Sequence, residues 1–269
     1  MSEERGFEFH PGDAPLLVSV PHDGRAIPEA IAGRMTEHAL ELPDTDWHVA
    51  RLYAFCRGLG ASLLVARCSR YVIDLNRPPD DGALYRGQMT TGLCPTMSFA
   101  GLALYRDGEE PDSSEIRERV SKYWEPYHAR IADCLNAMVE QHGHALLWDA
   151  HSIASEVPLL FEGRLPVLNI GTNGGASCAA PLRDAVSAVA NESPFSLVTD
   201  GRFRGGYITR HYGDPARGRH AIQLELAQRA YMDERLRLYD EDRAARLAGT
   251  LAGMLAAFAN SAAALYGSR

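Results

Sequence analysis

Short apolar runs that end in polar residues restrict how this chain can fold more than any other feature. Five such runs occur: 15–20 (PLLVSV), 62–67 (SLLVAR), 144–149 (HALLWD), 166–170 (PVLNI) and 220–226 (HAIQLEL). Runs of this length and composition are typical of strands buried on both faces. Helical patterns separate most of them, and this alternation is typical of α/β proteins. The sequence therefore predicts an α/β fold with a mixed, mostly parallel sheet flanked by helices.

Apolar residues recur at helical spacing between the predicted strands. We expect helices over four segments: 45–58, 113–141, 176–191 and 234–264. Asp44 or Thr45 is available to cap the first of these, and Pro126 is a possible kink in the second. Residues 70–75 (RYVIDL) and 195–199 are predicted to be extended.

Residues 77–112 are rich in Pro and Gly and show little periodicity. A loop of this length inside a compact domain is usually functional or an insertion, and this one is the natural candidate for a lid over a substrate. The sequence shows no internal repeat. We expect residues 1–269 to form a single domain, which at this length buries its core without disulfides or a structural metal.

Charge and cysteine content exclude several classes of protein. The net charge of −8 argues against a nucleic-acid partner, because phosphate binding needs a basic face. Five dispersed cysteines without a CxxC pair predict reduced thiols. The opening MSEERGFEFH lacks the apolar core of a signal peptide, and Ala-rich 245–264 follows an amphipathic pattern. We therefore expect a cytoplasmic protein with no membrane partner; its oligomeric state stays open.

Polar side chains stand at the ends of several predicted strands. These residues are His22, Asn76, Arg77, His151 and Glu225. Ligands of open α/β sheets gather at the carboxyl ends of the strands, so we expect these side chains to lie together. Two imidazoles and a carboxylate suit a metal site, because zinc hydrolases use three N or O protein ligands and keep one position open.

The third ligand is sought in the segment Asp44-Thr45-Asp46-Trp47-His48. Asp44, Asp46 and His48 are all candidates, and Asp44 also suits a purely structural role as a helix cap. A lone histidine after a strand is more often a hydrogen-bonded loop residue than a ligand. The occurrence of His22 and His151 at two strand ends is what favours the metal site.

Glu225 lies inside an apolar run, where an unpaired carboxylate is costly to bury. Gln223 shares its face by the two-residue period of a strand, so that face is partly polar. A carboxylate there suits a general base that takes a proton from water. Asn76 and Arg77 suit bidentate capture of a substrate carboxylate, although Arg77 would also suit the protein surface. Ser152 is either a supporting hydroxyl or a turn residue.

Common catalytic motifs of other classes are missing from the sequence. It has no GxSxG elbow of a serine hydrolase, and its glycine-rich segment 201–206 lacks the GxGxxG arrangement between a strand and a helix. The cysteines have no evident base partner. These weaker candidates are therefore set aside.

The chain resembles the N-formylglutamate amidohydrolases, also called N-formylglutamate deformylases. The resemblance runs through most of the chain in the family's order, and the NIGTNGGASC and DTDWH segments are the most distinctive. The matching segments are VSVPHDGRAIP (18–28), LPDTDWHVARLY (42–53), SRYVIDLNRPPDD (69–81), WDAHSI (148–153), LFEGRLPVLNIGTNGGASC (160–178), GGYITRHYG (205–213) and HAIQLELAQRAYM (220–232).

The resemblance implies a fold similar to the zinc carboxypeptidases, of the phosphorylase/hydrolase-like type. It implies one divalent metal ion, with zinc expected, held by His22, Asp46 and His151, and Glu225 as the general base. Cobalt, manganese and iron also accept such ligands.

The second ligand departs from the carboxypeptidase spacing. That spacing places an acid three residues after His22, where this chain has Arg25. Asp44 and His48 therefore remain alternatives to Asp46.

The resemblance also implies the substrate, a small anionic amino-acid derivative. The reaction would be hydrolysis of N-formyl-L-glutamate to L-glutamate and formate, in histidine degradation. Asn76 with Arg77 would bind one carboxylate, and Arg70, Arg210 or Arg204 the other; pairing with surface acids is the alternative for the last three. The alternatives to this function are another N-acyl amino acid deacylase, a carboxypeptidase-like metallohydrolase and a non-catalytic metal-binding or anion-binding homologue.

Overall fold

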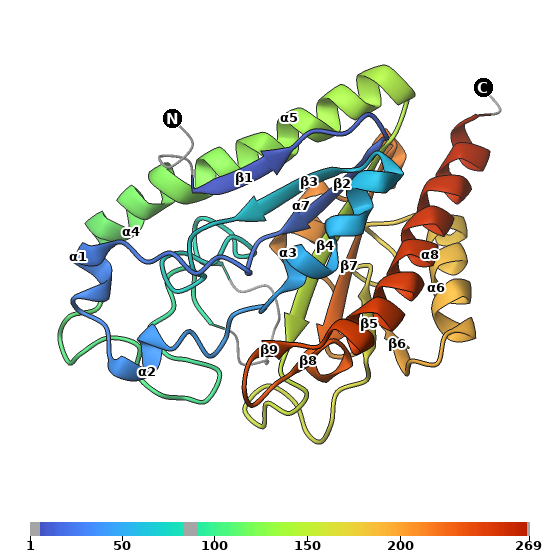
Figure 1. Ribbon diagram of the computed structural model, residues 1–269. Coiled ribbons are helices and arrows are strands. Elements are labelled where there is room, and N and C mark those ends of the chain that lie inside the picture. Colours follow the sequence, from blue (N-terminus) through green and yellow to red (C-terminus); the bar gives the residue numbers. More distant parts are fainter. Residues whose placement is uncertain (1–5, 83–90, 268–269) are drawn as a thin grey trace.

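The computed structural model describes residues 6–82 and 91–267, and they are built around one seven-stranded sheet (Figure 1). Four of the six strand pairs are parallel, and the pairs β1–β3 and β5–β7 are antiparallel. The strands in spatial order are β1 (Phe7–His10), β3 (Ser62–Ala66), β2 (Leu16–Val20), β4 (Ala145–Ile153), β7 (Arg219–Ala227), β5 (Leu168–Gly171) and β6 (Leu197–Thr199). The predicted mixed, mostly parallel α/β sheet is confirmed.

Helices cover both faces of this sheet. They are α1 (Glu29–Ala32), α2 (Glu37–Leu40), α3 (Val49–Leu52), α4 (Ser113–Arg119), α5 (Glu125–His142), α6 (Ala180–Glu192), α7 (Tyr207–Tyr212) and α8 (Glu241–Tyr266). A π-helical turn over Val120–Trp124 joins α4 to α5, which places Pro126 in the first turn of α5. A small hairpin of β8 (Met232–Asp233) and β9 (Leu238–Tyr239) precedes α8.

The alternation of side chains along the strands divides the core into two layers. In β2, Leu17 packs with Tyr127 and Ile131 of α5. Its neighbour Val18 points to the opposite face, where α6 and α8 pack, as with Phe258 of α8. Figure 1 shows the same division, with α4 and α5 along one side and α6 and α8 along the other. Because both faces are covered, the central strands are apolar almost throughout.

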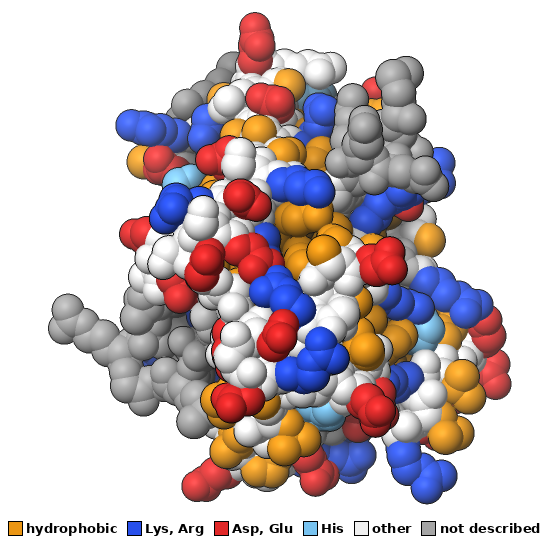
Figure 2. Space-filling model, turned by 90° about the vertical axis from the view of Figure 1, so that its left-hand side faces the viewer, with side chains coloured by type: hydrophobic (Ala, Val, Ile, Leu, Met, Phe, Trp, Pro, Cys, Tyr) orange, Lys and Arg blue, Asp and Glu red, His pale blue; other side chains and the backbone are white. Residues whose placement is uncertain are grey.

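Helix α8 is long and apolar enough to cross a membrane by length and composition. Its large apolar side chains from Leu247 to Phe258 are buried in the layer that it shares with α6 and the sheet, whereas Leu265 near its end is exposed. On the face shown in Figure 2, acidic and basic side chains are interspersed over the described residues.

The helix predicted over 45–58 is shorter than expected. Only α3 is α-helical, and a 3₁₀ segment over Ala54–Leu59 follows it. Neither Asp44 nor Thr45 caps it. The carboxylate of Asp23 does so instead, because its two oxygens accept hydrogen bonds from the backbone N–H groups of His48 (3.1 Å) and Ala50 (2.9 Å). The cap comes from a distant segment, and local sequence does not reveal it.

The prediction that 70–75 is extended is wrong, because the segment forms a turn. Arg70 and Asp74 form an ion pair across it (2.8 Å), and the Ser69 hydroxyl accepts a hydrogen bond from the N–H of Tyr71. These side-chain contacts favour the turn relative to an extended conformation. The edge strand β1 (FEFH) was not predicted, because it lacks the continuous apolar run of the central strands.

The region 77–112 contains no helix or strand in its described part, as predicted. Residues 83–90 lie outside the described residues. The remainder makes isolated bridges, such as those between Met35 and Tyr105 and between Met97 and Ala103. Its role as a lid therefore stays a prediction.

Candidate active site

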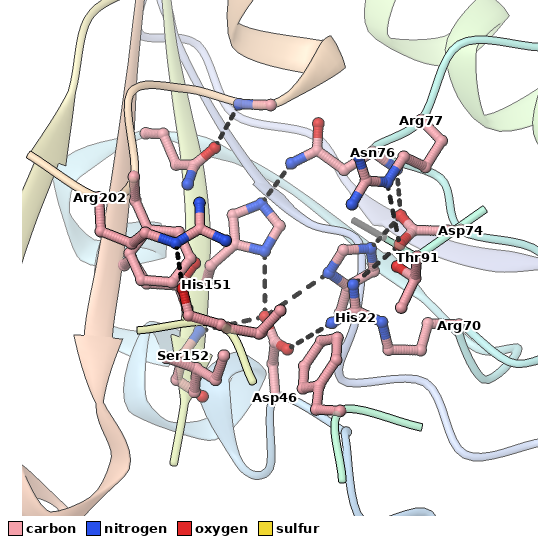
Figure 3. Close-up of a pocket in the computed structure, with 17 residues that line it drawn as sticks. His22, Asp46, Arg70, Asp74, Asn76, Arg77, Thr91, His151, Ser152 and Arg202 are labelled. Atoms are coloured by element: carbon pink, nitrogen blue, oxygen red, sulfur yellow. Dashed lines mark hydrogen bonds and ion pairs between the residues drawn. The ribbon is translucent and has the colours of Figure 1, made fainter. Parts of the chain in front are cut away.

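The polar residues predicted at the strand ends lie around one pocket of about 90 Å³ (Figure 3). His22 follows β2, His151 lies near the end of β4, and Glu225 lies in β7 directly beside His151 in the parallel register. Asp46 comes from the loop before α3, and its backbone N–H donates to the carbonyl of His22 (3.1 Å). The sheet therefore positions three of these residues, and one loop adds the fourth.

His22, Asp46 and His151 form a compact, buried cluster of metal-binding groups. One ligand atom of each lies within 4.8 Å of the others. Oδ2 of Asp46 is 3.0 Å from Nδ1 of His151 and 3.8 Å from Nδ1 of His22. The two distances from Asp46 are short enough for both atoms of each pair to bind one zinc ion at about 2.0–2.1 Å.

The other two candidates for the third ligand point elsewhere. Asp44 accepts a hydrogen bond from the backbone N–H of Phe99 (2.8 Å). The ring of His48 faces the carbonyl of Arg237 (3.0 Å). Of the three, Asp46 alone belongs to the cluster within the described residues.

Each histidine of the cluster is oriented by a second carboxylate. Nε2 of His22 lies 2.7 Å from Asp74, and Nε2 of His151 lies 3.1 Å from Asp149. This leaves Nδ1 of both rings directed at Asp46. A carboxylate on the far nitrogen of a metal-binding histidine fixes the ring and its tautomer.

Asp74 and Asp149 were missed in the sequence, although a usable signal was present. Both interrupt apolar runs, YVIDL and LLWDA, in the same way that Glu225 interrupts IQLEL. A buried carboxylate needs a partner, so each of these interruptions indicates a functional or structural pair.

The pKa shifts of the two histidines suit a site that binds a cation. Burial and the nearby Arg70 lower the pKa of His22, which favours the neutral imidazole that binds metals. Nδ1 of His22 is buried without a hydrogen-bond partner. Burial opposes protonation of His151, but Asp149 and Asp46 raise its pKa well above the usual value. The acids of the cluster favour positive charge at His151, and Nδ1 of His22 is unsatisfied. Both features fit a bound divalent ion.

Glu225 is the least stabilised carboxylate in the pocket. Burial raises its pKa to about 8; His151 and Arg70 oppose this rise, and Asp46 adds to it. Gln223 lines the same pocket, which confirms the shared polar face. Its side-chain oxygen accepts from the N–H of Gly206 (2.6 Å). A carboxyl group that exchanges its proton near neutral pH suits acid–base chemistry.

Asn76 lines the pocket and is held on several sides. Its Nδ2 lies 3.1 Å from Asp149 and 2.8 Å from Nε2 of His151, and its Oδ1 accepts from the N–H of Ile208 (2.8 Å). Arg77 lines the pocket beside it, with Nε 3.9 Å from Asp74. Both predicted residues therefore reach the site, and Asn76 also supports His151.

Arg70 is buried among the acids of the site. It contacts Asp74 (2.8 Å) and Asp46 (3.5 Å), and its guanidinium lies 4.8 Å from the ring centroid of Phe99. These contacts connect the carboxylates of Asp46 and Asp74 through one guanidinium. Arg70 therefore organises the cluster as well as lining the pocket.

The described lining of the pocket includes neither Arg210 nor Arg204. Arg210 donates to the carbonyl of Gly205 (2.7 Å) and Arg204 to that of Asp200 (3.1 Å). Arg202 lines the pocket instead, with Nε donating to the carbonyl of Leu160 (2.6 Å). The sequence pattern pointed to neighbouring arginines instead, because a loop carries no period that orients its side chains.

Ser152 supports the cluster from within β4. Its backbone N–H donates to Oδ2 of Asp46 (3.1 Å), and its hydroxyl lies 2.7 Å from that of Tyr231. The supporting role considered for this serine is thus the one seen.

Comparison with known proteins identifies the family. Residues 14–232 match the model of the N-formylglutamate amidohydrolase family. The chain belongs to this family. An N-formylglutamate deformylase of Pseudomonas putida is 50% identical over 232 residues, which are 86% of each chain. A protein of the same name from Pseudomonas aeruginosa is 52% identical over 227 residues, 84% of this chain and 85% of the relative.

Solved structures agree with the fold. The N-formylglutamate amidohydrolase of Ralstonia eutropha JMP134 superposes with a TM-score of 0.80 at 23% identity, covering 94% of this chain and 97% of the other. A gene product of Agrobacterium tumefaciens gives 0.74 at 19% identity, with 96% and 97% covered. At these identities the likeness supports the amidohydrolase fold alone. The resemblance noted in the sequence is confirmed by the family match, and the chain is an amidohydrolase of this family.

Proposed function

We propose that this amidohydrolase cleaves N-formyl-L-glutamate to L-glutamate and formate. The observation that carries the proposal is the buried cluster of His22, Asp46 and His151 beside Glu225, in a pocket that three arginines also line. The two Pseudomonas relatives, both named N-formylglutamate deformylase, match at about half identity over most of the chain.

We infer that His22, Asp46 and His151 hold one divalent ion, and that Asp74 and Asp149 orient the two imidazoles. Zinc is the ion proposed, because a set of two histidines and one carboxylate with an open position is typical of zinc hydrolases. When bound, such an ion lowers the pKa of a water from about 15.7 towards about 7 and polarises the amide carbonyl.

Glu225 is the proposed general base. It takes a proton from the attacking water as the bond to the formyl carbon forms, and it returns that proton to the amide nitrogen as the C–N bond breaks. The raised pKa of about 8 suits the second step, in which the group must hold the proton. A cation beside it lowers this pKa, so that the free carboxylate is available for the first step.

Two cations suit the two carboxylates of the glutamate moiety. Arg77 and Arg202 both line the pocket and lie on opposite sides of the histidine cluster (Figure 3). We propose that Arg77, with Asn76 beside it, binds one carboxylate and Arg202 the other. Arginine suits this role because its planar guanidinium pairs with a carboxylate through two hydrogen bonds.

The setting of the enzyme is also a proposal. We infer a cytoplasmic enzyme of histidine degradation, folded as one domain over residues 1–269. We expect neither a nucleic-acid nor a membrane partner. Support comes from the net charge of −8, the dispersed cysteines and the burial of the apolar side of α8.

Formate release tests the function directly. Purified protein is given N-formyl-L-glutamate with and without prior chelation, and N-formyl-L-aspartate and N-acetyl-L-glutamate in parallel. We expect chelator-sensitive release that favours the formyl-glutamate. Absence of formate from metal-loaded protein would refute the deformylase function and leave another N-acyl amino acid, a carboxypeptidase-like reaction or a binding role.

A further inference from the structure

A second pocket, of about 190 Å³, adjoins the catalytic one. Phe99 and Ile153 line both pockets and therefore form the partition between them. The second pocket is largely apolar, with walls that include Ala154, Val157 and Pro158. The proposed reaction gives this second space no role.

The partition is fixed relative to the metal-binding cluster. The N–H of Phe99 is bonded to Asp44 (2.8 Å), and the guanidinium of Arg70 lies 4.8 Å from the centroid of its ring. Arg70 in turn contacts Asp46. Ile153 is buried and ends β4. Because His151 comes two residues earlier in the same strand, Ile153 and His151 lie on the same face of β4.

Charge separates the two pockets as well. Three arginines and three acids line the catalytic pocket, whereas the charged residues described around the second pocket are the acids Asp44 and Glu156. The carboxylates of a glutamate moiety can pair with arginines in the first pocket, and the described lining of the second offers them only acids. The acyl end of the substrate is therefore the part that meets the partition.

We propose that Phe99 and Ile153 restrict the enzyme to the formyl group by closing the second pocket against the acyl carbon. This inference rests on the proposed function. The formyl carbon carries only hydrogen on that side, whereas an acetyl or propionyl group needs room that the two side chains occupy. The second pocket holds several times the roughly 30 Å³ that one water fills in the liquid, so joining it to the first makes room for such groups.

The test compares Phe99→Ala and Ile153→Ala with wild type on the N-formyl, N-acetyl and N-propionyl derivatives of L-glutamate. We expect the ratio of kcat/KM for acetyl over formyl to rise at least tenfold in Phe99→Ala, and propionyl to become a substrate. Val157→Ala is the matched control, because it enlarges the second pocket and leaves the partition intact. Its ratio should equal that of wild type.

Wild-type formate release tests the function, and the change in ratio tests the partition, so the two can fail separately. If wild type releases acetate as fast as formate, or if both partition variants keep the wild-type ratio, the partition does not set the acyl group. If Phe99→Ala does not fold, Phe99→Leu tests the partition instead, because leucine is apolar but smaller than phenylalanine. N-succinyl-L-glutamate should stay inert in all variants because Asp44 and Glu156 repel it.

Discussion

Four buried carboxylates, Asp46, Asp74, Asp149 and Glu225, surround the two histidines of the site. Buried charges are costly unless they are paired and hydrogen-bonded. The first three have a histidine or arginine within about 3 Å. Among the described residues, Glu225 forms no comparable ion pair, and burial raises its pKa. This difference in pairing separates Asp46, the proposed ligand, and the two proposed orienting acids from Glu225, the proposed base.

Glu225→Gln should abolish most turnover while metal binding persists. The amide keeps the shape of the side chain but cannot take a proton, and general acid–base catalysis contributes about 10²–10⁴-fold. Formate release and metal content are measured on the same preparation. Glu241→Gln, at an exposed acid, is the control. Retained turnover in Glu225→Gln would remove this residue from the role of base.

Arg202→Met should lower kcat/KM for N-formyl-L-glutamate by about 10–100-fold, the range for a lost charged hydrogen bond. N-formyl-L-norvaline lacks the side-chain carboxylate, so its hydrolysis should change little. Arg210→Met, outside the described pocket lining, should leave both substrates unaffected. An equal loss on both substrates would show that Arg202 does not recognise that carboxylate.

Among the single elements, strand β4 positions the most residues of the proposed site. Asp149, His151 and Ile153 follow one another at the two-residue period and share one face. Their proposed roles are those of an orienting acid, a metal-binding imidazole and part of the partition. The parallel partner β7 sets Glu225 beside His151. One pair of strands thus fixes the spacing between the proposed ligand and the proposed base.

Asp149→Asn should weaken zinc binding by about 10–100-fold, because an outer carboxylate orients its histidine and makes it more basic. Competition with a fluorescent chelator measures the affinity. Asp133→Asn, at an exposed position of α5, is the control. Unchanged affinity in Asp149→Asn, in a variant with normal thermal stability, would contradict the orienting role.

Helix α5 contributes a buried histidine that should make stability depend on pH. His128 contacts the carbonyl of Leu75 (2.9 Å) and the hydroxyl of Tyr212 (3.0 Å), and burial lowers its pKa to about 3. The unfolded chain takes up this proton below about 6.5, whereas the folded one does not. The free energy of unfolding should therefore fall as pH drops from about 6.5 towards 3, by up to about 1.4 kcal/mol per pH unit from this group.

Urea unfolding of wild type and His128→Gln between pH 7.5 and 4.5 measures this effect. The variant should be less stable at pH 7.5 and show a shallower loss towards acid. His10→Gln, at a partly exposed histidine, should keep the wild-type slope. Equal slopes in all three proteins would exclude His128 as a source of the pH dependence.

For the whole molecule, the site joins the two halves of the chain. Its residues come from segments between His22 and Glu225, and the sheet that carries them packs against α5 on one face and α6 and α8 on the other. An ion bound at the cluster therefore holds distant segments together, and its binding free energy adds to the stability of the fold.

Chelation should lower the melting temperature, and zinc should restore it. An ion at about 1,000 times its Kd stabilises by about 4 kcal/mol. For a chain of this size that is a shift of roughly 10 °C. Scanning calorimetry measures it, and Asp46→Asn should show a much smaller difference between the two states. If wild type has the same melting temperature with and without zinc, tight zinc binding does not contribute to the stability of the fold.

The sequence by itself determined the α/β class, the central strands and most of the site residues. Strand periodicity and apolar runs are local patterns, and they were enough to place His22, His151 and Glu225 at one edge of the sheet. The same reasoning applied to YVIDL would have found Asp74. What these patterns describe is which residues a strand buries and where it ends.

Only the tertiary structure decided which neighbours of those residues enter the site. It selected Asp46 over Asp44 and His48, turned residues 70–75 away from an extended path, and brought Arg202 into the pocket. The turn at 70–75 is stabilised by contacts within the segment, whereas Asp46 and Arg202 share another physical reason. Loops are oriented by contacts with segments far along the chain, such as the bond from Asp46 to the carbonyl of His22, and no local period encodes these contacts.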